Sequence, residues 1–206
     1  MIRRLAEVSG RPVSRETFAK IEQFAGLLVA ESEQQNLIAA STLDELWERH
    51  IVDSAQLARF EPKAGASWID IGSGAGLPGM IIALLTQGSI TLVEPRRLRV
   101  EFLERVVDAL DLRPRVRVVH GKADKELGKY DVITARAVAT TDRLLAMTLH
   151  LSHRGTVWLL PKGKSGKSDL ADAERTWQGA FRSEASLTNP QAVILVASGV
   201  HVKGRR

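Results

Sequence analysis

The sequence predicts an α/β fold in which helices cover a mostly parallel sheet. After residue 66, short apolar stretches of strand length alternate with amphipathic stretches of helix length. The first apolar stretch, 68–71, runs into glycines at positions 72, 74 and 76 and then into a helical pattern. The second, 90–93, ends in Glu94, about 20 residues after the glycines, where a doubly wound fold places the carboxylate that holds a ribose diol. The three observations together predict a nucleotide-type site at the carboxyl edge of the sheet.

Composition narrows the class of protein. A chain of 206 residues with 44% hydrophobic and 26% charged residues can form one domain, or one domain with an extension, around a sizeable core. The absence of cysteine excludes disulfides, thiolate metal sites and cysteine catalysis. A net charge of +5 favours polyanionic partners. Because no apolar run reaches membrane-spanning length and no signal core is present, we expect a cytosolic protein without membrane contact.

The N-terminal part reads as a helical cap over residues 1–62. Residues 1–13 form a loose lead-in or a short helix, and Ser14 can cap a helix that runs to about residue 35. The segment 42–45 has the pattern of a capping box, with Glu45 three residues after Thr42. It predicts a second helix that ends near Phe60, just before Pro62. Residues 63–206 then form the predicted sheet domain.

The sheet domain follows as alternating elements with right-handed crossovers. The alternation of arginine and valine in 115–120 favours a strand towards one side of the sheet. Gly155 is expected to separate a helix from the fifth strand, and a closing antiparallel pair ends the domain. The predicted helices are 96–110, 140–151 and 168–178, and the remaining predicted strands are 130–135, 156–160, 181–188 and 191–197.

Two readings compete for the glycine loop. A dinucleotide fingerprint, G-x-G-x-x-G, begins at Gly74, but it places Gly72 inside a strand, where glycine is poor. Beginning at Gly72 instead puts Leu77 at the third glycine position. In the other register, Asp70 precedes three alternating glycines, and its carboxylate suits a cationic ligand and would repel a diphosphate. We favour this second reading. A Walker loop ending at 166–168 is rejected because Pro161 occupies the position of its first glycine.

Several segments in order resemble the small-subunit ribosomal RNA methyltransferase G family, also called glucose-inhibited division protein B. The resemblance covers about residues 20–165. Its motifs include an "RHxxDS" pattern, a "D-x-G-x-G-x-G-x-P-G" loop, a "KRxxFL" helix, an "SRAV" strand end and an "LKG" segment. In this chain they correspond to Arg49–Ser54, Asp70–Gly79, Arg99–Leu103, Ala135–Val138 and Leu160–Gly163, and Asn36-Leu37 closes the first helix as in the family.

The resemblance implies a class I, Rossmann-like fold that binds S-adenosylmethionine, with a seven-stranded, mostly parallel sheet and an N-terminal helical extension. It implies methylation of N7 of a guanine in a loop of 16S ribosomal RNA, with no metal. The implied cofactor residues are Gly72, Gly74, Leu77, Glu94 at the ribose, Ala123 and Asp124 at the adenine, and Arg136 closing the site. The chain departs from the family pattern at Ile38, Pro95 and Lys122.

The implied reaction explains why the sequence offers no acid–base pair. N7 of guanine carries a free lone pair, so it can attack a sulfonium methyl without a general base, and catalysis is mostly positioning. We expect Arg136 and Lys162 to position the substrate, with Arg49 and His50 as further contacts. Two basic groups are predicted to hold RNA phosphates, namely Lys162, Lys164 and Lys167 in the first and Arg96, Arg97 and Arg99 in the second.

The expected partner is 16S ribosomal RNA, within the 30S subunit or its assembly intermediate, and the protein is expected to act as a monomer. Two other functions stay open at the level of sequence. One is a methyltransferase of the same fold with a small-molecule or protein substrate. The other is a nicotinamide-dependent oxidoreductase or nucleotide-binding regulator.

Overall fold

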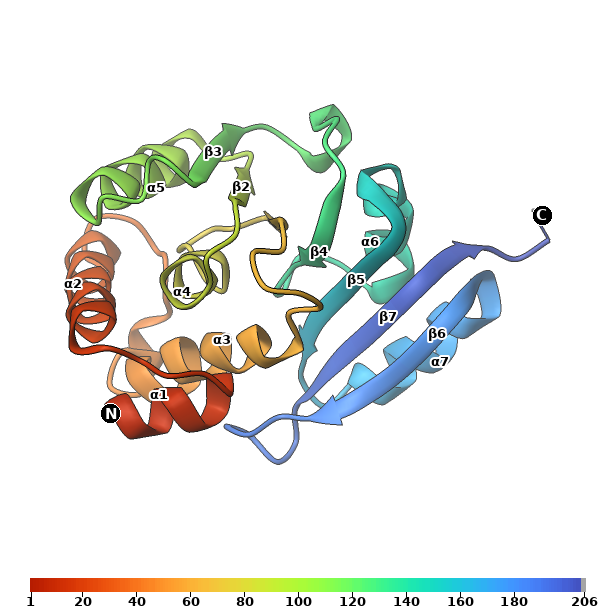
Figure 1. Cartoon of the computed structure of the whole chain (residues 1–206), viewed down its shortest axis with the longest axis horizontal. Coiled ribbons are helices and arrows are strands. Elements are labelled where there is room, and N and C mark those ends of the chain that lie inside the picture. Colours follow the sequence, from red (N-terminus) through yellow and green to blue (C-terminus); the bar gives the residue numbers. More distant parts are fainter. Residues whose placement is uncertain (205–206) are drawn as a thin grey trace.

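The computed structural model describes residues 1–204, and a seven-stranded sheet forms its centre (Figure 1). The strands follow the order β3-β2-β1-β4-β5-β7-β6. β1 to β5 run parallel to one another, and β7 is antiparallel to both β5 and β6. The α/β class, the closing antiparallel pair and the outer place of the arginine–valine strand are confirmed. The strands are β1 (Trp68–Ile71), β2 (Ile90–Glu94), β3 (Val116–His120), β4 (Tyr130–Thr134), β5 (Ser152–Lys162), β6 (Trp177–Ala185) and β7 (Val193–Val202).

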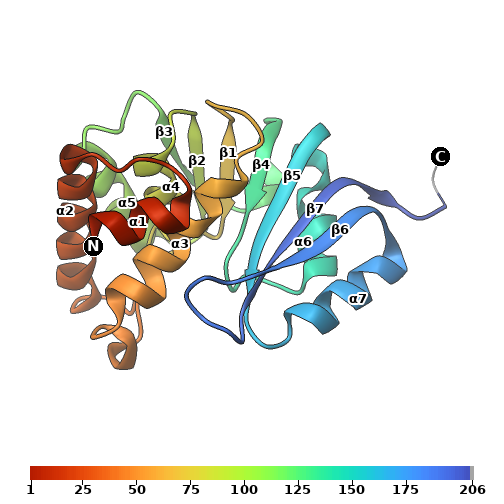
Figure 2. The same cartoon turned by 60° about the horizontal axis from the view of Figure 1, so that its bottom comes forward.

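Helices cover both faces of the sheet, so the central strands are buried on both sides. One hydrophobic core joins the sheet to α4 and α5, and a second joins it to α6 and α7 on the other face (Figure 2). β1 shows the alternation, since Trp68 belongs to the first core and Ile69 to the second. These helices are α4 (Gly79–Leu85), α5 (Arg97–Ala109), α6 (Thr141–Thr148) with the 3-10 turn η5 (Leu149–Leu151), and α7 (Gly166–Thr176).

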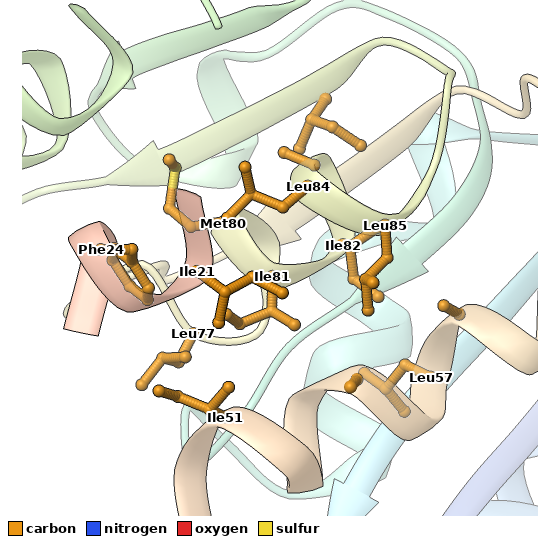
Figure 3. Close-up of a cluster of buried hydrophobic side chains, with 14 of the residues drawn as sticks. Ile21, Phe24, Ile51, Leu57, Leu77, Met80, Ile81, Ile82, Leu84 and Leu85 are labelled. Carbon is orange, nitrogen blue, oxygen red and sulfur yellow. The ribbon is translucent and has the colours of Figure 1, made fainter. Parts of the chain in front are cut away.

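The N-terminal helices pack into the first core. Figure 3 shows Ile21, Phe24 and Ile51 beside Leu77 and Ile81 of the segment that follows the glycine loop. The cap therefore rests on the same buried surface that supports the loop, while its boundary with the sheet domain at residues 62 and 63 stays a prediction. The cap consists of α1 (Ile2–Ser9), α2 (Arg15–Ser32), the 3-10 turn η1 (Ala40–Thr42), a π-helix η2 (Trp47–Val52), α3 (Asp53–Ala55) and a 3-10 turn η3 (Gln56–Phe60).

The predicted capping box at Thr42 is wrong, whereas the cap at Ser14 is confirmed. Ser14 accepts a hydrogen bond from the backbone N–H of Thr17. Thr42 instead donates to the carbonyl of Ala39, and its hydroxyl contacts His50 at 3.0 Å. Glu45 pairs with Arg49 at 2.9 Å rather than reaching back to the threonine. A contact with His50, eight residues later, has thus replaced the capping box, and the helix begins with a π-helical segment at Trp47.

The fifth strand begins earlier than the pattern predicts. β5 starts at Ser152 and includes Gly155, so the glycine does not separate the helix from the strand. Tyr130 pairs with Ser152 and Val132 with Val157, which leaves an irregularity in β5 between the two pairs. Gly155 lies inside this irregularity, a position at which a glycine in a strand is common.

The parallel strands end at one edge of the sheet, and the loops that follow them carry the predicted site residues.

Among residues 1–204, no helix is both long and apolar enough to cross a membrane.

Candidate functional site

The glycine loop after β1 has the left-handed backbone that favours glycine. The φ angles of Gly72, Gly74 and Gly76 are 69°, 55° and 84°. The backbone N–H of Gly72 and that of Ser73 both donate to the carbonyl of Val93, at 2.8 and 3.0 Å. A Cβ on Gly72 would lie 2.7 Å from Cγ2 of Val138, which reaches the loop from beyond β4. Both the φ angle and this contact restrict position 72 to glycine.

Glu94, at the end of β2, holds the loop in place. One carboxylate oxygen accepts from the backbone N–H of Gly74 and the other from that of Arg96, each at 2.9 Å. The side chain is only 3% exposed. Each carboxylate oxygen has two lone pairs, so both retain capacity for a further donor such as a ribose hydroxyl.

Asp70 is the buried acid beneath the loop. Its Oδ2 accepts from the backbone N–H of Gly79 at 3.1 Å, whereas Oδ1 is buried and has no hydrogen-bond partner among the described residues. Burial raises the pKa of the carboxyl to about 7, against the hydrogen bond from Gly79 and the charge of Arg136, which lower it. An unpartnered buried carboxylate oxygen is costly, and a donor or a cation would satisfy it.

The other predicted cofactor residues lie around this edge. Leu77 is 4% exposed, and its side chain packs in the first core (Figure 3). Only the backbone of Leu77 is therefore left to contact a cofactor. Ala123 and Asp124 lie in the 3-10 turn η4 (Ala123–Lys125), which follows β3. Ala123 is buried and Asp124 is exposed. The structure thus places the glycine loop, Glu94 and the η4 turn after the neighbouring strands β1, β2 and β3.

Arg136 follows β4 and reaches across to the cap. Its Nη1 lies 3.4 Å from Nδ1 of His50 and 4.0 Å from Oδ2 of Asp53. The guanidinium is partly buried, with 23% of the side chain exposed. Arg136 therefore stands between the cofactor edge and the cap helix, and it joins the two parts of the predicted site.

His50 belongs to a chain of hydrogen bonds that defines its protonation. Arginine can only donate, so Nδ1 of His50 accepts and the proton resides on Nε2, which donates to the hydroxyl of Thr42 at 3.0 Å. Burial, with the charges of Arg136 and Arg49, lowers the pKa of His50 to about 4. His50 is therefore neutral near pH 7. Its contact with Arg136 requires this neutral form, because Nδ1 can accept from the guanidinium only when it carries no proton.

Lys162, at the end of β5, is engaged within the protein. Its ammonium lies 3.0 Å from Oδ2 of Asp169 and donates to the carbonyl of Ala139 at 3.0 Å. Only 13% of the side chain is exposed. Lys162 thus holds the loop that carries Arg136, and much of its charge is compensated by Asp169.

A cleft of about 920 Å³ opens beside Arg136, between the cap helix and the ends of β5 and β7. Arg49, His50, Arg136 and Lys162 all line it, so the structure brings the four predicted substrate residues together. Its side chains include three cations, Arg49, Arg136 and Lys162, and four carboxylates, Asp44, Glu45, Glu48 and Asp53. The second predicted basic group lies elsewhere, where Arg96, Arg97 and Arg99 line a hollow of about 270 Å³ with Gln35 and Asn36.

Sequence reasoning missed the residues that join the cap to the sheet domain. Asp53 and Gln56 bind the turn between β6 and β7, and Val138 packs on Gly72. Asp53 stands in the motif-like segment 49–54, which was the one available signal for it. Val138 likewise ends the motif-like segment 135–138, whereas no local pattern marks Gln56. No group of three metal-ligating side chains occurs within the described part of the chain.

The amino-acid sequence is similar to those of known proteins over most of its length. A family model described as rRNA small subunit methyltransferase G matches residues 17–192. The ribosomal RNA small subunit methyltransferase G of Zymomonas mobilis is 46% identical over 202 residues, which cover 94% of this chain and 91% of the relative. The protein of the same name from Rhizorhabdus wittichii is 47% identical over 203 residues, covering 97% and 93%.

Solved structures confirm the fold. The ribosomal protein L11 methylase of Lactobacillus delbrueckii subsp. bulgaricus aligns with a TM-score of 0.57 and 16% identity, over 74% of this chain and 79% of that one. Such a likeness bears on the fold alone. The family model and the two relatives decide the family, and this chain belongs to the rRNA small subunit methyltransferase G family of S-adenosylmethionine-dependent enzymes.

Proposed function

We propose that this protein transfers the methyl group of S-adenosylmethionine to N7 of a guanine in a loop of 16S ribosomal RNA. The observation that carries the proposal is the position of Arg136, between the glycine loop and the cleft. Family membership supports the ribosomal RNA substrate, and the residues at the site support the chemistry.

The residues after β1 and β2 fit S-adenosylmethionine better than a dinucleotide. Asp70 lies buried beneath the loop with one unpartnered oxygen, and its negative charge would attract a cationic ligand and repel a diphosphate. Glu94 retains lone pairs for a ribose diol beside the loop. We therefore assign the cofactor to Gly72, Gly74, the backbone of Leu77, Glu94, Ala123 and Asp124. When bound, S-adenosylmethionine supplies an electrophilic methyl group carried on a positively charged sulfur.

The chain supplies positioning rather than proton transfer. N7 of guanine carries no proton, and its neighbouring O6 is an acceptor on the same edge of the base. Arg136 can donate to O6 and so orient the base, leaving the N7 lone pair free. The neutral His50 and the carboxylate of Asp53 hold the guanidinium from the cap side. Precise placement of reacting atoms can supply much of a rate enhancement.

The cleft suits an uncharged base, and phosphates suit its surroundings. Its side-chain cations are outnumbered by carboxylates, so a phosphate inside it would meet little net attraction. The target guanine must leave its stack to enter, as bases do when enzymes modify them. Lys164 and Lys167, in the loop and first turn beyond Lys162, can hold the backbone outside the cleft. Lys162 acts chiefly through the loop that it binds.

We further propose that the substrate is the 30S subunit or an assembly intermediate, that the protein acts as a monomer, and that it works in the cytoplasm. The test is methyl incorporation from labelled cofactor into undermodified 30S subunits, free 16S RNA and transfer RNA, with purified protein. Incorporation into 30S subunits and none into transfer RNA is expected. Label in transfer RNA or in ribosomal protein instead of 16S RNA would overturn the proposal.

A further inference from the structure

The turn between β6 and β7 is a self-supporting unit that reaches the cap helices (Figure 1). The backbone N–H of Ser186 donates to the carbonyl of Ala192, and that of Ala192 to the carbonyl of Asn189, each at 3.0 Å. The backbone N–H of Gln191 donates to Oδ1 of Asn189 at 2.9 Å. These contacts fix the backbone of the turn, while Asn189 and Pro190 stay exposed.

Three cap residues bind this turn across a long stretch of sequence, and the first of them, Arg4, donates from Nη2 to the carbonyl of Leu187 at 2.9 Å. Oδ1 of Asp53 accepts from the hydroxyl of Thr188 at 2.6 Å, and also from Nε2 of Gln56 at 2.8 Å. Gln56, which is 1% exposed, accepts from the backbone N–H of Leu187 at 2.9 Å and donates to Ser186 at 3.1 Å. The buried side-chain amide of Gln56 has its hydrogen bonds satisfied in this position of the turn. Moving the turn away would leave those polar groups unpaired, which is costly.

The other oxygen of Asp53 faces the proposed methyl-transfer site. Oδ2 lies 4.0 Å from Nη1 of Arg136, and the Asp53 side chain is 20% exposed. A single carboxylate therefore holds the turn through one oxygen and faces the substrate-orienting guanidinium through the other. Movement of the turn would disturb this carboxylate, and through it Arg136.

The turn also forms one side of the cleft. Ser186, Thr188, Asn189 and Pro190 line it opposite the cap-helix residues around Arg49. At about 920 Å³ the cleft lies near the upper end of the range for small-molecule sites, so it has room for more than the target base. Polar groups without net charge on this side suit the base or ribose of a neighbouring nucleotide rather than its phosphate.

We propose that the β6–β7 turn is the wall that holds the RNA strand next to the target guanine, and that Asp53 is the positioning residue that couples this wall to Arg136. The inference rests on the proposed function, since it takes single-stranded ribosomal RNA as the occupant. It adds an RNA-contacting surface, residues 186–190, and assigns roles to Asp53, Gln56 and Thr188.

Two variants separate the two halves of the coupling. Thr188→Val removes the hydroxyl that binds Asp53 and keeps the shape of the side chain. It should raise KM for 30S subunits about tenfold, the effect of about one lost hydrogen bond to a charged group. It should lower kcat less than Asp53→Asn does, because Gln56 still donates to the same oxygen of Asp53. Asp53→Asn keeps an acceptor for Thr188 but removes the charge beside Arg136, so it should lower kcat. Glu184→Gln, whose carboxylate pairs with Arg182 on β6, is the matched acid-to-amide control.

Crosslinking tests the contact with RNA directly. Because the chain contains no cysteine, a photoreactive group can be attached at a single introduced cysteine. A photoreactive group on Pro190→Cys should crosslink 16S RNA within a few nucleotides of the methylated guanine, and the same group on Glu184→Cys should not. Calorimetry with S-adenosylhomocysteine should give wild-type affinity for Thr188→Val and Asp53→Asn.

Three outcomes would overturn the inference. The first is that Thr188→Val and Asp53→Asn have the same kinetics as Glu184→Gln. The second is that these two variants lose cofactor affinity and thermal stability together with activity. The third is that the labels at positions 190 and 184 crosslink 16S RNA equally. If the wild-type protein methylates no 16S RNA, the proposed function fails. In that case the role of the β6–β7 turn is tested by the affinity for RNA, which Thr188→Val should weaken and Glu184→Gln should not.

Discussion

Replacement of Asp70 by asparagine should change how the stability of the ligand-free protein depends on pH. Burial raises the pKa of Asp70 from 3.8 to about 7 in the folded protein. The folded state therefore binds a proton that the unfolded state has already released between about pH 4 and pH 7, and wild-type stability is lost as pH rises through this window. Asparagine retains an acceptor for the N–H of Gly79 and has no charge to bury.

The magnitude follows from the pKa difference. At about 1.36 kcal/mol per pKa unit, the free energy of unfolding of Asp70→Asn should gain on that of the wild type by up to about 4 kcal/mol between pH 4 and pH 7. Above pH 7 the gain should level off. Titration of His50 and Asp131, whose pKa values are lowered to about 4 and about 2, is shared by both proteins and cancels from the difference.

Urea unfolding of the two proteins at pH 5, 6, 7 and 8 measures the effect. A stability difference that stays constant over this range would refute the account of Asp70 as a buried, unpartnered acid. Cofactor binding supplies a second readout. A cationic ligand should keep Asp70 ionised, so binding of S-adenosylmethionine, which carries a sulfonium, should release a proton at pH 6 in calorimetry with buffers of different ionisation enthalpy, and its binding to Asp70→Asn should release none.

Three further predictions concern the rest of the site. The C2 proton of His50 should titrate near pH 4 in NMR spectra, and Arg136→Met should move the midpoint upward because a neighbouring positive charge is lost; an unchanged midpoint would separate the two residues. Gly72→Ala should lose at least tenfold in affinity for S-adenosylhomocysteine, and Val138→Ala should restore part of it by removing the clash but not the backbone strain; wild-type affinity of Gly72→Ala would contradict the role of the loop. RNA affinity should fall steeply as salt rises, with a linear log–log slope, and an affinity independent of salt would remove the phosphate contacts.

Local patterns predicted the strands, the glycine loop and the helix on the proposed cofactor side of the site. Strand, glycine loop and helix follow each other within residues 68–85, so their hydrophobic periodicity and glycine spacing predict the turn directly. Glu94 ends a buried strand, and its distance from the loop follows from the doubly wound topology. Arg136 was also expected, since it follows a parallel strand, and all such strands end at the same edge of the sheet.

Contacts between distant segments could not be predicted from the sequence. Thr42 and Glu45 match a capping box, but the hydroxyl of Thr42 bonds to His50 instead, because a tertiary partner was available. Lys162 was expected to contact the substrate and RNA phosphates, while Asp169 pairs with it from the next helix. The bond between Asp53 and Thr188 joins residues 135 positions apart, and nothing in the composition of either segment indicates it.

The most direct test of the central claim is to map the methylated atom. Undermodified 30S subunits are incubated with the protein and S-adenosylmethionine, and the 16S RNA is digested and analysed by mass spectrometry and by chemical cleavage at N7-methylguanine. We expect one N7-methylguanine, in a loop of 16S RNA, that is formed by the wild type and lost with Arg136→Gln although this variant still binds S-adenosylhomocysteine. Methylation at another atom or another class of base, or full activity of Arg136→Gln, would contradict this expectation.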